Sequence, residues 1–306
     1  MTGAEVAARS GRHVAARIGP VGLWSTIFHW HTAARAREML AKVEELGFGA
    51  VWVGEAKGKP SVTLASLLLC GSERIVVATG IASIWARDPV TMANDARTLA
   101  DAAPGRFVLG LGVSHPFLTE PRGREYRAPL EHMRWYLQAM DEAPWYGPEV
   151  EPPPRVLAGL GPKMLELARD RAAGAHPYFV PVEHTQVARR ILGPEPLLAP
   201  EQAAVFETDP ARAREVARRY MAGYLKLKNY TTNLRRLGWA DEDLAGGGSD
   251  RLVDALVAWG DRDRVAARVK EHLQAGADHV AVRILTSDPK DFPERELHEL
   301  AEAMGL

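Results

Sequence analysis

Short apolar runs alternate with amphipathic stretches along almost the whole chain. Residues 32–48 carry apolar side chains three and four positions apart, a spacing that places them on one face of a helix. Residues 49–56 (GAVWVGEA) form a short, mostly apolar run, which is typical of a buried strand. The predicted strands are residues 17–25, 49–56, 74–84, 106–114, 154–161, 175–182, 197–208 and 278–285. The predicted helices are residues 32–48, 61–72, 88–105, 130–143, 162–174, 183–192, 209–225 and 263–277.

Eight strands that alternate with helices predict an α/β fold, a TIM-type (β/α)8 barrel that forms one domain over residues 1–306. Residues 226–260 have helical character, so we expect a helical insertion before the eighth strand. A doubly wound sheet with an appended helical region is the alternative. Residues 1–20 lack the continuous apolar core of a signal peptide and are expected to form a short extension before the first strand.

Composition narrows the classes of partner. The net charge of −1 gives no electrostatic reason to expect nucleic acid or an anionic membrane. No apolar run approaches the roughly 18 residues that span a bilayer, and we expect a cytoplasmic protein. Arginine far outnumbers lysine and alanine is abundant, a composition associated with GC-rich bacterial genomes.

The single cysteine, Cys70, excludes an internal disulfide and a cysteine metal cluster. It stands at the apolar end of a predicted helix and is expected to be a buried structural thiol rather than a nucleophile. His29 and His31 would point to opposite sides of an extended segment, which disfavours a metal site there. The sequence has no HExxH motif and no G-x-S-x-G motif, so we expect no metal and no serine hydrolase.

The turn between the fifth predicted strand and its helix is rich in glycine. In VLAGLGPKMLELARD (156–170), Gly159 and Gly161 precede Pro162, which fits the first position of a helix. A helix start leaves backbone N–H groups unpaired and carries partial positive charge, so this turn predicts an anion site. The alternative is a tight turn between packed elements. The segment LGLGVSHP does not predict a dinucleotide site, because His115 occupies the position of the third glycine.

In a TIM-type barrel the active site lies where the strands end and the following loops begin. Residues distant in the sequence are therefore expected around one mouth. They are Trp24, Ser25, Glu55, Ser83, Ile84, Trp85, Ser114, His115 and Gly159–Gly161. A barrel whose mouth contains an anion-binding helix start indicates a phosphate-bearing cofactor.

Three segments carry a resemblance to a known family. They are AKVEELGFGAVWVGEA (41–56), RIVVATGIASIWARDPVTMANDARTLADAAPGRFVLGLGVSHP (74–116) and RVLAGLGPKMLELARDRAAGAHPYFV (155–180). Together they resemble the luciferase-like monooxygenase superfamily, within its coenzyme F420-dependent branch, over most of residues 18–290. The resemblance implies an oxidoreductase that transfers a hydride between F420 and a small organic substrate. An FMN-dependent monooxygenase of the same fold and a flavin-binding barrel without catalysis are the alternatives.

The resemblance also implies where the cofactor binds. Its ring would lie across the mouth, and the turn at 159–161 would offer backbone amides to its phosphate. A bulge with a cis peptide bond between Gly80 and Ile81 would back the ring, and an ordinary trans bond is the alternative. The expected cofactor-binding residues are Gly80, Ile81, Ser114, Gly159, Leu160, Gly161, Met164 and His176.

Two residues are candidates for catalysis. Some members of the superfamily carry an acidic residue followed by histidine after the second strand, where this chain has Glu55 and Ala56, and this departure disfavours sugar-phosphate oxidation. His115 matches a position where relatives place a proton-donating group, and histidine can donate or accept a proton near neutral pH. If His115 is instead bonded to a loop carbonyl, Glu55 is the next catalytic candidate.

Four aromatic residues bear on the substrate. Trp24, Trp85, Trp145 and Tyr178 are expected to line a pocket for a hydrophobic or planar ligand, with burial in the core as the alternative. The resemblance implies a homodimer, because related proteins commonly pair through helices.

Overall fold

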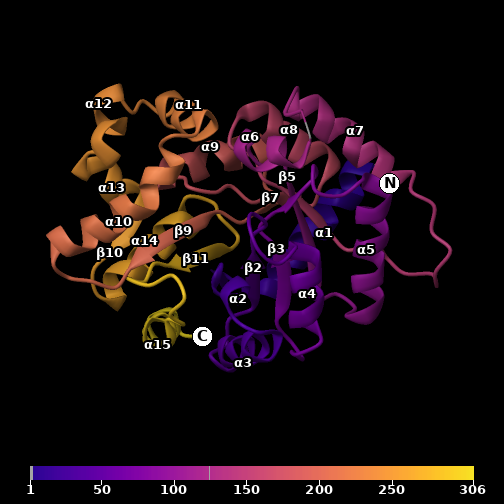
Figure 1. Cartoon of the computed structure of the whole chain (residues 1–306), viewed down its shortest axis with the longest axis horizontal. Helices are drawn as coiled ribbons and strands as arrows, with labels where there is room; N and C mark the ends of the chain where they lie inside the picture. The colour runs from indigo at the N-terminus through magenta and orange to yellow at the C-terminus, as the bar shows by residue number, and fades with distance from the viewer. Residues whose placement is uncertain (1–2, 124) are drawn as a thin grey trace.

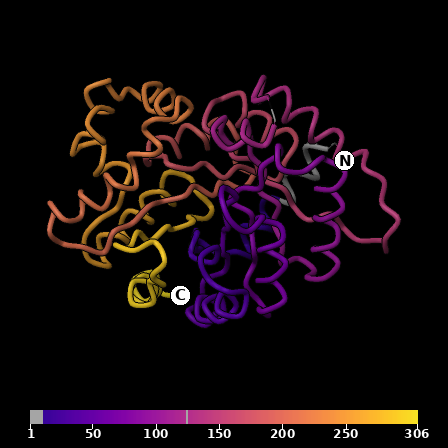
Figure 2. Tube along the Cα trace, viewed as in Figure 1, coloured from indigo at the N-terminus to yellow at the C-terminus, as the bar shows by residue number. Residues whose placement is uncertain are grey.

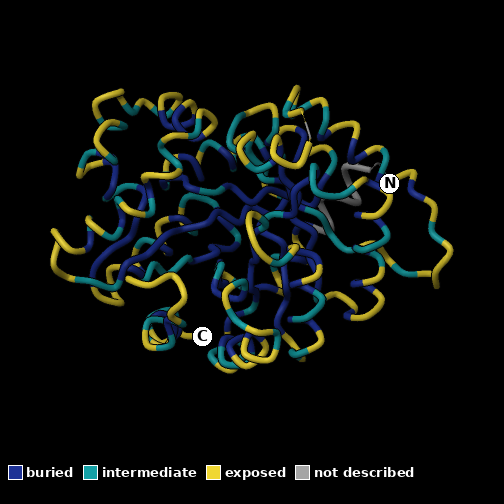
Figure 3. Tube along the Cα trace, viewed as in Figure 1, coloured by how far each residue is buried: buried dark blue, intermediate teal, exposed yellow. Residues whose placement is uncertain are grey.

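Parallel strands run through the centre of the molecule and helices surround them (Figure 1). The computed structural model describes residues 3–123 and 125–306. The strands are β1 Val21–Trp24, β2 Ala50–Val53, β3 Val76–Thr79, β4 Ala82–Ser83, β5 Phe107–Gly112, β6 Arg155–Leu157, β7 Gly174–Ala175, β8 Leu197–Leu198, β9 Glu201–Val205, β10 Val257–Trp259 and β11 Val280–Ile284. Almost all their residues are buried, which explains why the strands read as continuous apolar runs (Figure 3).

Helices follow most strands, as the alternating pattern predicts. The longer helices are α1 Gly3–Ile18, α3 Ala33–Glu45, α4 Ser61–Leu69, α5 Pro89–Ala102, α7 Pro129–Asp141, α8 Pro162–Arg171, α9 Val182–Leu192, α10 Pro210–Tyr224, α11 Lys228–Arg236, α14 Arg262–Gln274 and α15 Glu294–Met304. The shorter ones are α2 Ile27–Trp30, α6 Pro116–Thr119, η1 Glu120–Arg122, α12 Asp241–Leu244, η2 Ala245–Gly247 and α13 Asp250–Leu256. Asp88 and Asp209 cap α5 and α10 by accepting hydrogen bonds from backbone N–H groups of the first turn. These helix starts are therefore encoded locally.

The sheet is curled, as in TIM-like folds. Its order is β10-β9-β11-β1-β2-β3-β5-β6-β7-β8, with β4 beside β5, and the pairings are parallel. Residues 197–205 join both sides of this order. The Ala199 N–H donates to the Ala175 carbonyl (3.0 Å), and the Ala281 N–H donates to the Pro200 carbonyl (2.9 Å). The first strand along the chain, β1, also pairs with the last, β11; they are coloured indigo and yellow in Figure 2.

The expected N-terminal extension is instead a helix, α1, and the prediction of a simple extension was wrong. Val14 and Ile18, one helical turn apart, pack into the interior of the curled sheet with Trp52 and Val156. A Cβ atom on Gly11 would lie 2.5 Å from the Ala173 carbonyl oxygen, so α1 touches the chain just before β7. The helix therefore covers the amino ends of the strands and leaves the carboxyl ends open for a site.

Residues 226–260 contain α11, α12, η2, α13 and the strand β10. The strand was not predicted, because its three residues are too short to give a pattern; it pairs with β9. Tyr230 and Leu234 of α11 pack in the same apolar cluster as Leu252 and Leu256 of α13. The segment is thus a packed layer above one part of the sheet.

Cys70 is exposed, and the prediction of a buried thiol was wrong. The buried face of α4 carries Val62, Ala65 and Leu69, whereas Cys70 follows Thr63 by seven residues and so shares its exposed face. No helix in the described part of the chain is both long and apolar enough to cross a membrane.

Candidate functional site

Residues after three different strands share one narrow cleft, as the sequence predicts. The cleft is lined by Glu55, Ala56, Ser83, Trp85, Ser114, Leu118, Thr119 and Arg122. Arg122 of η1 donates from Nη2 to the Ala56 carbonyl at 3.2 Å, which ties the loop after β5 to the loop after β2. Four residues expected around the mouth therefore meet in this cleft, namely Glu55, Ser83, Trp85 and Ser114, whereas the other expected residues do not line it.

Glu55 is a buried link within this mouth, with its side chain only 5% exposed. Arg87 Nη1 donates to both carboxylate oxygens, at 3.0 and 3.2 Å. The backbone N–H groups of Ser61 and Ser83 donate to the same carboxylate at 3.2 and 2.8 Å. Because these donors occupy both oxygens, Glu55 holds α4 and β4 in place.

The Gly80–Ile81 peptide bond is cis, which confirms that part of the prediction. The Gly80 carbonyl accepts a 2.9 Å hydrogen bond from Trp24 Nε1. A Cβ atom on Gly80 would lie 2.8 Å from that nitrogen and 3.1 Å from His176 Nε2, so glycine alone fits between the two rings. Ile81 covers Gly112, where an added Cβ would lie 2.5 Å from the isoleucine side chain.

Beside Gly80, His176 has a ring nitrogen that can accept a hydrogen bond. Its Nδ1 lies 2.6 Å from the Ala199 carbonyl, and its ring stacks on Trp52 with 4.3 Å between centroids. Because Nδ1 must donate to the carbonyl, Nε2 carries a lone pair, and this buried atom has no partner among the described residues. Burial lowers the pKa of His176 to about 4, so the ring is neutral at pH 7.

His115 follows β5 and stands at the start of α6. Its ring centroid lies 5.8 Å from that of Phe117 and 5.6 Å from that of Tyr230. Neither imidazole nitrogen makes a hydrogen bond within residues 11–123 and 125–306, so the loop-carbonyl alternative does not describe His115 here. Burial lowers its pKa, which leaves the ring neutral and able to accept a proton at pH 7. Ser114 before it has a φ of 54°, in the left-handed region.

The predicted anion site has the geometry of an open helix start. Gly161 caps α8 without a side-chain hydrogen bond, and a proline follows at the first helical position. His184 of α9 fixes the turn, with Nε2 2.9 Å from the Leu160 carbonyl. A Cβ atom on Gly161 would lie 3.7 Å from the nearest guanidinium nitrogen of Arg236. The helix start and a cation therefore face the same space. Met164, in the first turn of α8, packs beside Gly159.

Sequence reasoning missed the contribution of α11. Its Tyr230 lies against His115 and its Arg236 lies beside Gly161. Six residues along a helix correspond to a rise of about 9 Å, so α11 spans the gap between the predicted proton carrier and the predicted phosphate cradle. No local signal could have revealed this, because both contacts join segments far apart in the sequence.

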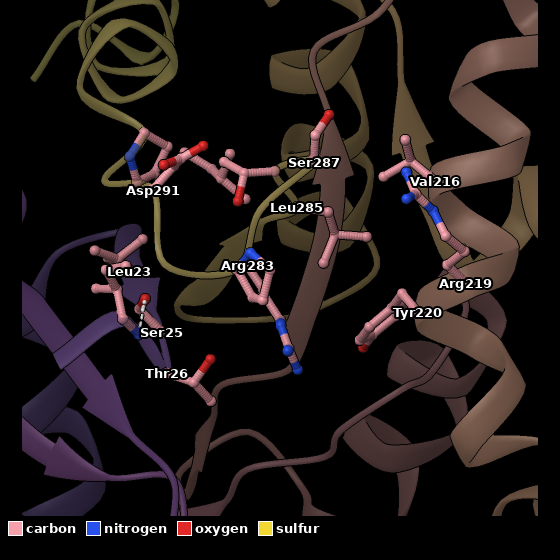
Figure 4. Close-up of a pocket in the computed structure, with 15 residues that line it drawn as sticks. Leu23, Ser25, Thr26, Val216, Arg219, Tyr220, Arg283, Leu285, Ser287 and Asp291 are labelled. Atoms are coloured by element: carbon pink, nitrogen blue, oxygen red, sulfur yellow. Dashed lines mark hydrogen bonds between the residues drawn. The ribbon is translucent and has the colours of Figure 1, made fainter. Parts of the chain in front are cut away.

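A second polar group was also missed, where the end of β7, the start of β9 and the end of β11 meet α10. We call it the arginine–tyrosine cluster; its members are Tyr178, Glu201, Tyr220, Tyr224 and Arg283. The Arg283 Nη1 donates to the hydroxyls of Tyr178 and Tyr224. Tyr220 donates to a Glu201 oxygen at 3.2 Å, and burial raises the pKa of Glu201 to about 7. Figure 4 shows Tyr220 and Arg283 at the edge of a cavity beside β1.

The four predicted pocket aromatics do not line one pocket. Trp24 and Tyr178 meet, with 5.1 Å between ring centroids, but Trp85 stacks on His132 instead. Trp145 lies in the loop that leads into the amino end of β6, on the side of the sheet opposite the mouth. Within the described chain, no three His, Cys, Asp or Glu side chains are grouped to hold a metal ion.

Comparison with known proteins shows the family of the chain. The luciferase-like monooxygenase family profile matches residues 8–279. A protein of Mycobacterium tuberculosis, provisionally named a coenzyme F420-dependent oxidoreductase, is 34% identical over 101 residues. That match covers 33% of this chain and 29% of the relative, less than a third of the relative's length.

Two solved structures share the fold. The coenzyme F420-dependent tetrahydromethanopterin reductase of Methanopyrus kandleri has a TM-score of 0.75 at 16% identity, over 94% of this chain and 98% of that one. The type II Baeyer–Villiger monooxygenase of Pseudomonas putida, in complex with FMN, has a TM-score of 0.65 at 15% identity, over 93% and 97%. At these identities the likeness shows the fold alone.

Proposed function

Because the chain belongs to the luciferase-like monooxygenase family, we propose that it is an oxidoreductase that transfers a hydride between coenzyme F420 and a small organic substrate. The observation that carries this proposal is the open start of α8 opposite Arg236, which suits a phosphate-bearing cofactor. The relative named for F420 supports this cofactor over FMN.

The chain fits such a cofactor in two places. The backbone amides of Leu160 and Gly161 and the guanidinium of Arg236 would hold the phosphate, since a helix start and a cation both favour an anion. The ring would lie against Gly80, where a larger residue is excluded, and near the free acceptor of His176. Ile81 and Ser114 would also lie beside the ring. F420, when bound, supplies or takes up the hydride.

His115 would carry the accompanying proton. When the substrate is oxidised, the unprotonated nitrogen of the His115 ring would accept the proton that the heteroatom of the substrate loses. When the substrate is reduced, His115 would return that proton. Phe117 and Tyr230 shield the ring from water and so keep it neutral before the reaction. Glu55, occupied by Arg87, holds the mouth in shape instead.

An FMN-dependent monooxygenase is the second candidate. The helix start and Arg236 suit the phosphate of FMN equally well, and a structural neighbour binds FMN. A flavin-binding barrel without catalysis is the third.

We further propose that the curled sheet is a closed (β/α)8 barrel in which β3–β4 and β8–β9 each count as one strand and β10 is not one of the eight. Residues 226–260 then form an insertion before the eighth strand. A homodimer stays a prediction.

Titration of the purified protein with F420 and with FMN tests the proposed function. We expect F420 to bind at least about tenfold more tightly than FMN, which corresponds to about 1.4 kcal/mol. Tighter binding of FMN would favour the monooxygenase, and binding of neither would refute the proposal. Tight binding without turnover on a panel of alcohols and ketones would favour the non-catalytic alternative.

A further inference from the structure

A cavity of about 300 Å³ opens between the carboxyl ends of β1 and β11 and the side of α10, and we call it the β1–β11 cavity (Figure 4). It is lined by Leu23, Ser25, Thr26, Ile27, Val216, Arg219, Tyr220, Arg283, Ile284, Leu285, Thr286, Ser287, Pro289, Asp291 and Pro293. Its size is at the lower end of the range for small-molecule sites. None of the residues that would hold the cofactor phosphate lines it.

Arg283 is a half-buried cation that makes no ion pair with any described residue. Its guanidinium is sandwiched between two rings, 4.6 Å from the centroid of Trp24 and 4.8 Å from that of Tyr220. Its hydrogen bonds go from Nη1 to the phenol oxygens of Tyr178 and Tyr224, and no carboxylate in the described chain lies within ion-pair distance. Its hydrogen-bond partners are neutral phenols, and Glu201 acts on it only from beyond ion-pair distance. A partly desolvated cation in such surroundings favours an anion on its open side.

The edge of the Arg283 guanidinium formed by Nε and Nη2 has the right shape to bind a carboxylate. Nε and Nη2 have no acceptor within residues 11–123 and 125–306, and the side chain lines the cavity. These two groups form a planar fork that binds both oxygens of a carboxylate at once. Two phenols and two rings already hold the guanidinium in place, so little side-chain freedom is left to lose on binding.

The other residues that line the cavity indicate what kind of ligand body fits it and what net charge it carries. Leu23, Ile27, Val216 and Leu285 give the cavity apolar walls, which suit a hydrocarbon chain or ring. Two arginines, Arg283 and the exposed Arg219, face one carboxylate, that of Asp291. The cavity therefore has an excess of positive charge.

The cavity adjoins the place proposed for the cofactor ring. Trp24 contacts both, because its Nε1 donates to the Gly80 carbonyl and its ring lies beneath Arg283. Resting on the proposed function, we propose that the β1–β11 cavity binds the substrate and that the substrate is a small organic acid with an apolar body. Its carboxylate is held by the Nε and Nη2 groups of Arg283.

Calorimetric titration without cofactor tests the acid site. The probes are hexanoate and benzoate, each compared with its neutral amide. We expect the wild-type protein to bind each acid at least about tenfold more tightly than its amide, and Arg283→Gln to lose about 10- to 100-fold in acid affinity with amide affinity unchanged. Arg212→Gln, which removes an exposed arginine of helix α10 that does not line the cavity, should keep the preference.

Equal affinity for acid and amide in the wild-type protein overturns the proposal, and that comparison needs no variant. Preference retained in a folded Arg283→Gln protein overturns it as well. Should that variant fail to fold, Arg283→Lys keeps the buried charge but removes the fork, and we expect it to weaken acid binding while retaining the thermal transition.

The cofactor also carries anionic groups, so F420 and FMN are titrated against both proteins. Unchanged cofactor affinity in Arg283→Gln supports a substrate site. A loss of about tenfold or more in cofactor affinity, with no acid preference, assigns Arg283 to the cofactor and overturns the proposal. If the acid preference holds but neither cofactor binds, the proposed function fails and the acid site stands.

Discussion

Trp24 donates a 2.9 Å hydrogen bond from Nε1 to the carbonyl oxygen of Gly80 and thereby joins the end of β1 to the end of β3. The two residues are 56 positions apart in the sequence. The contact leaves no room for a side chain on Gly80, because the Cβ atom would press on Trp24 and His176 together.

Replacement of Gly80 with alanine should therefore lower the free energy of unfolding by about 1–3 kcal/mol, the usual cost of overpacking a core. Chemical denaturation measures it. Gly223→Ala is the matched control, because Gly223 lies within α10 and an added Cβ meets nothing within 4 Å. An equal and small effect of both substitutions would show that the rings can move aside.

Cofactor affinity should depend on the space between α8 and Arg236. Gly161→Val fills that space, while the φ of −87° and the 3.7 Å clearance at Gly161 allow the protein to fold. Arg236→Gln removes the cation and should weaken cofactor binding about tenfold, as expected for one charged hydrogen bond. Arg235→Gln is the control, since Arg235, the neighbour of Arg236 on α11, pairs with Asp241 instead. Unchanged cofactor affinity in both Gly161→Val and Arg236→Gln would show that the cofactor phosphate does not bind at this site.

Turnover should depend on His115. We expect His115→Ala to lower kcat by roughly 10²–10⁴-fold, the usual contribution of a positioned acid or base, with little change in cofactor affinity. Burial lowers the pKa of His115, so in substrate oxidation the wild-type rate should fall as the pH drops through that lowered pKa. The variant should lose this acidic limb. Steady-state rates from about pH 5 to 9 provide the measurement, and an unchanged limb would assign the titration to another group.

Two buried histidines should make the fold sensitive to acid. Burial lowers the pKa of His272 to about 3 and that of His279 to about 4, below the ordinary value of 6.5. The unfolded chain therefore takes up protons first, and stability is lost as the pH falls from about 6.5 toward 4, by up to about 3 kcal/mol for each histidine. His279→Gln should flatten this dependence, whereas the exposed His298→Gln should not. Urea unfolding at several pH values measures the slopes.

Glu201 should have the opposite effect. Its pKa is raised by burial to about 7 from an ordinary 4.5, so the folded protein holds this proton more firmly. The associated stability is complete below about pH 4.5 and is lost as the pH rises through 7. Glu201→Gln keeps a neutral side chain at all pH values, and its stability relative to wild type should rise by roughly 1–3 kcal/mol between pH 4.5 and 8. A difference that does not vary with pH would mean that Glu201 stays charged in the fold.

The sequence by itself determined the order of strands and helices, the caps of α5 and α10, and the glycine turn before α8. These features depend on neighbouring residues: apolar spacing selects a buried face, and aspartate or proline fixes a helix start. The resemblance supplied the cis bond at Gly80, and the predicted barrel supplied the expected mouth. The hydrophobic pattern did not predict the helix α1, because its buried stripe is narrow and includes Val14 and Ile18.

Tertiary structure decided which polar side chains meet. Arg236 reaches Gly161 from α11, and Arg283 reaches Tyr178 across 105 residues of sequence. A hydrophobic pattern records that a residue is buried but not what it is buried against, so neither arginine stands out from the many others in this chain. Only the curled sheet, which sets β11 beside β1, places the guanidinium of Arg283 against the ring of Trp24.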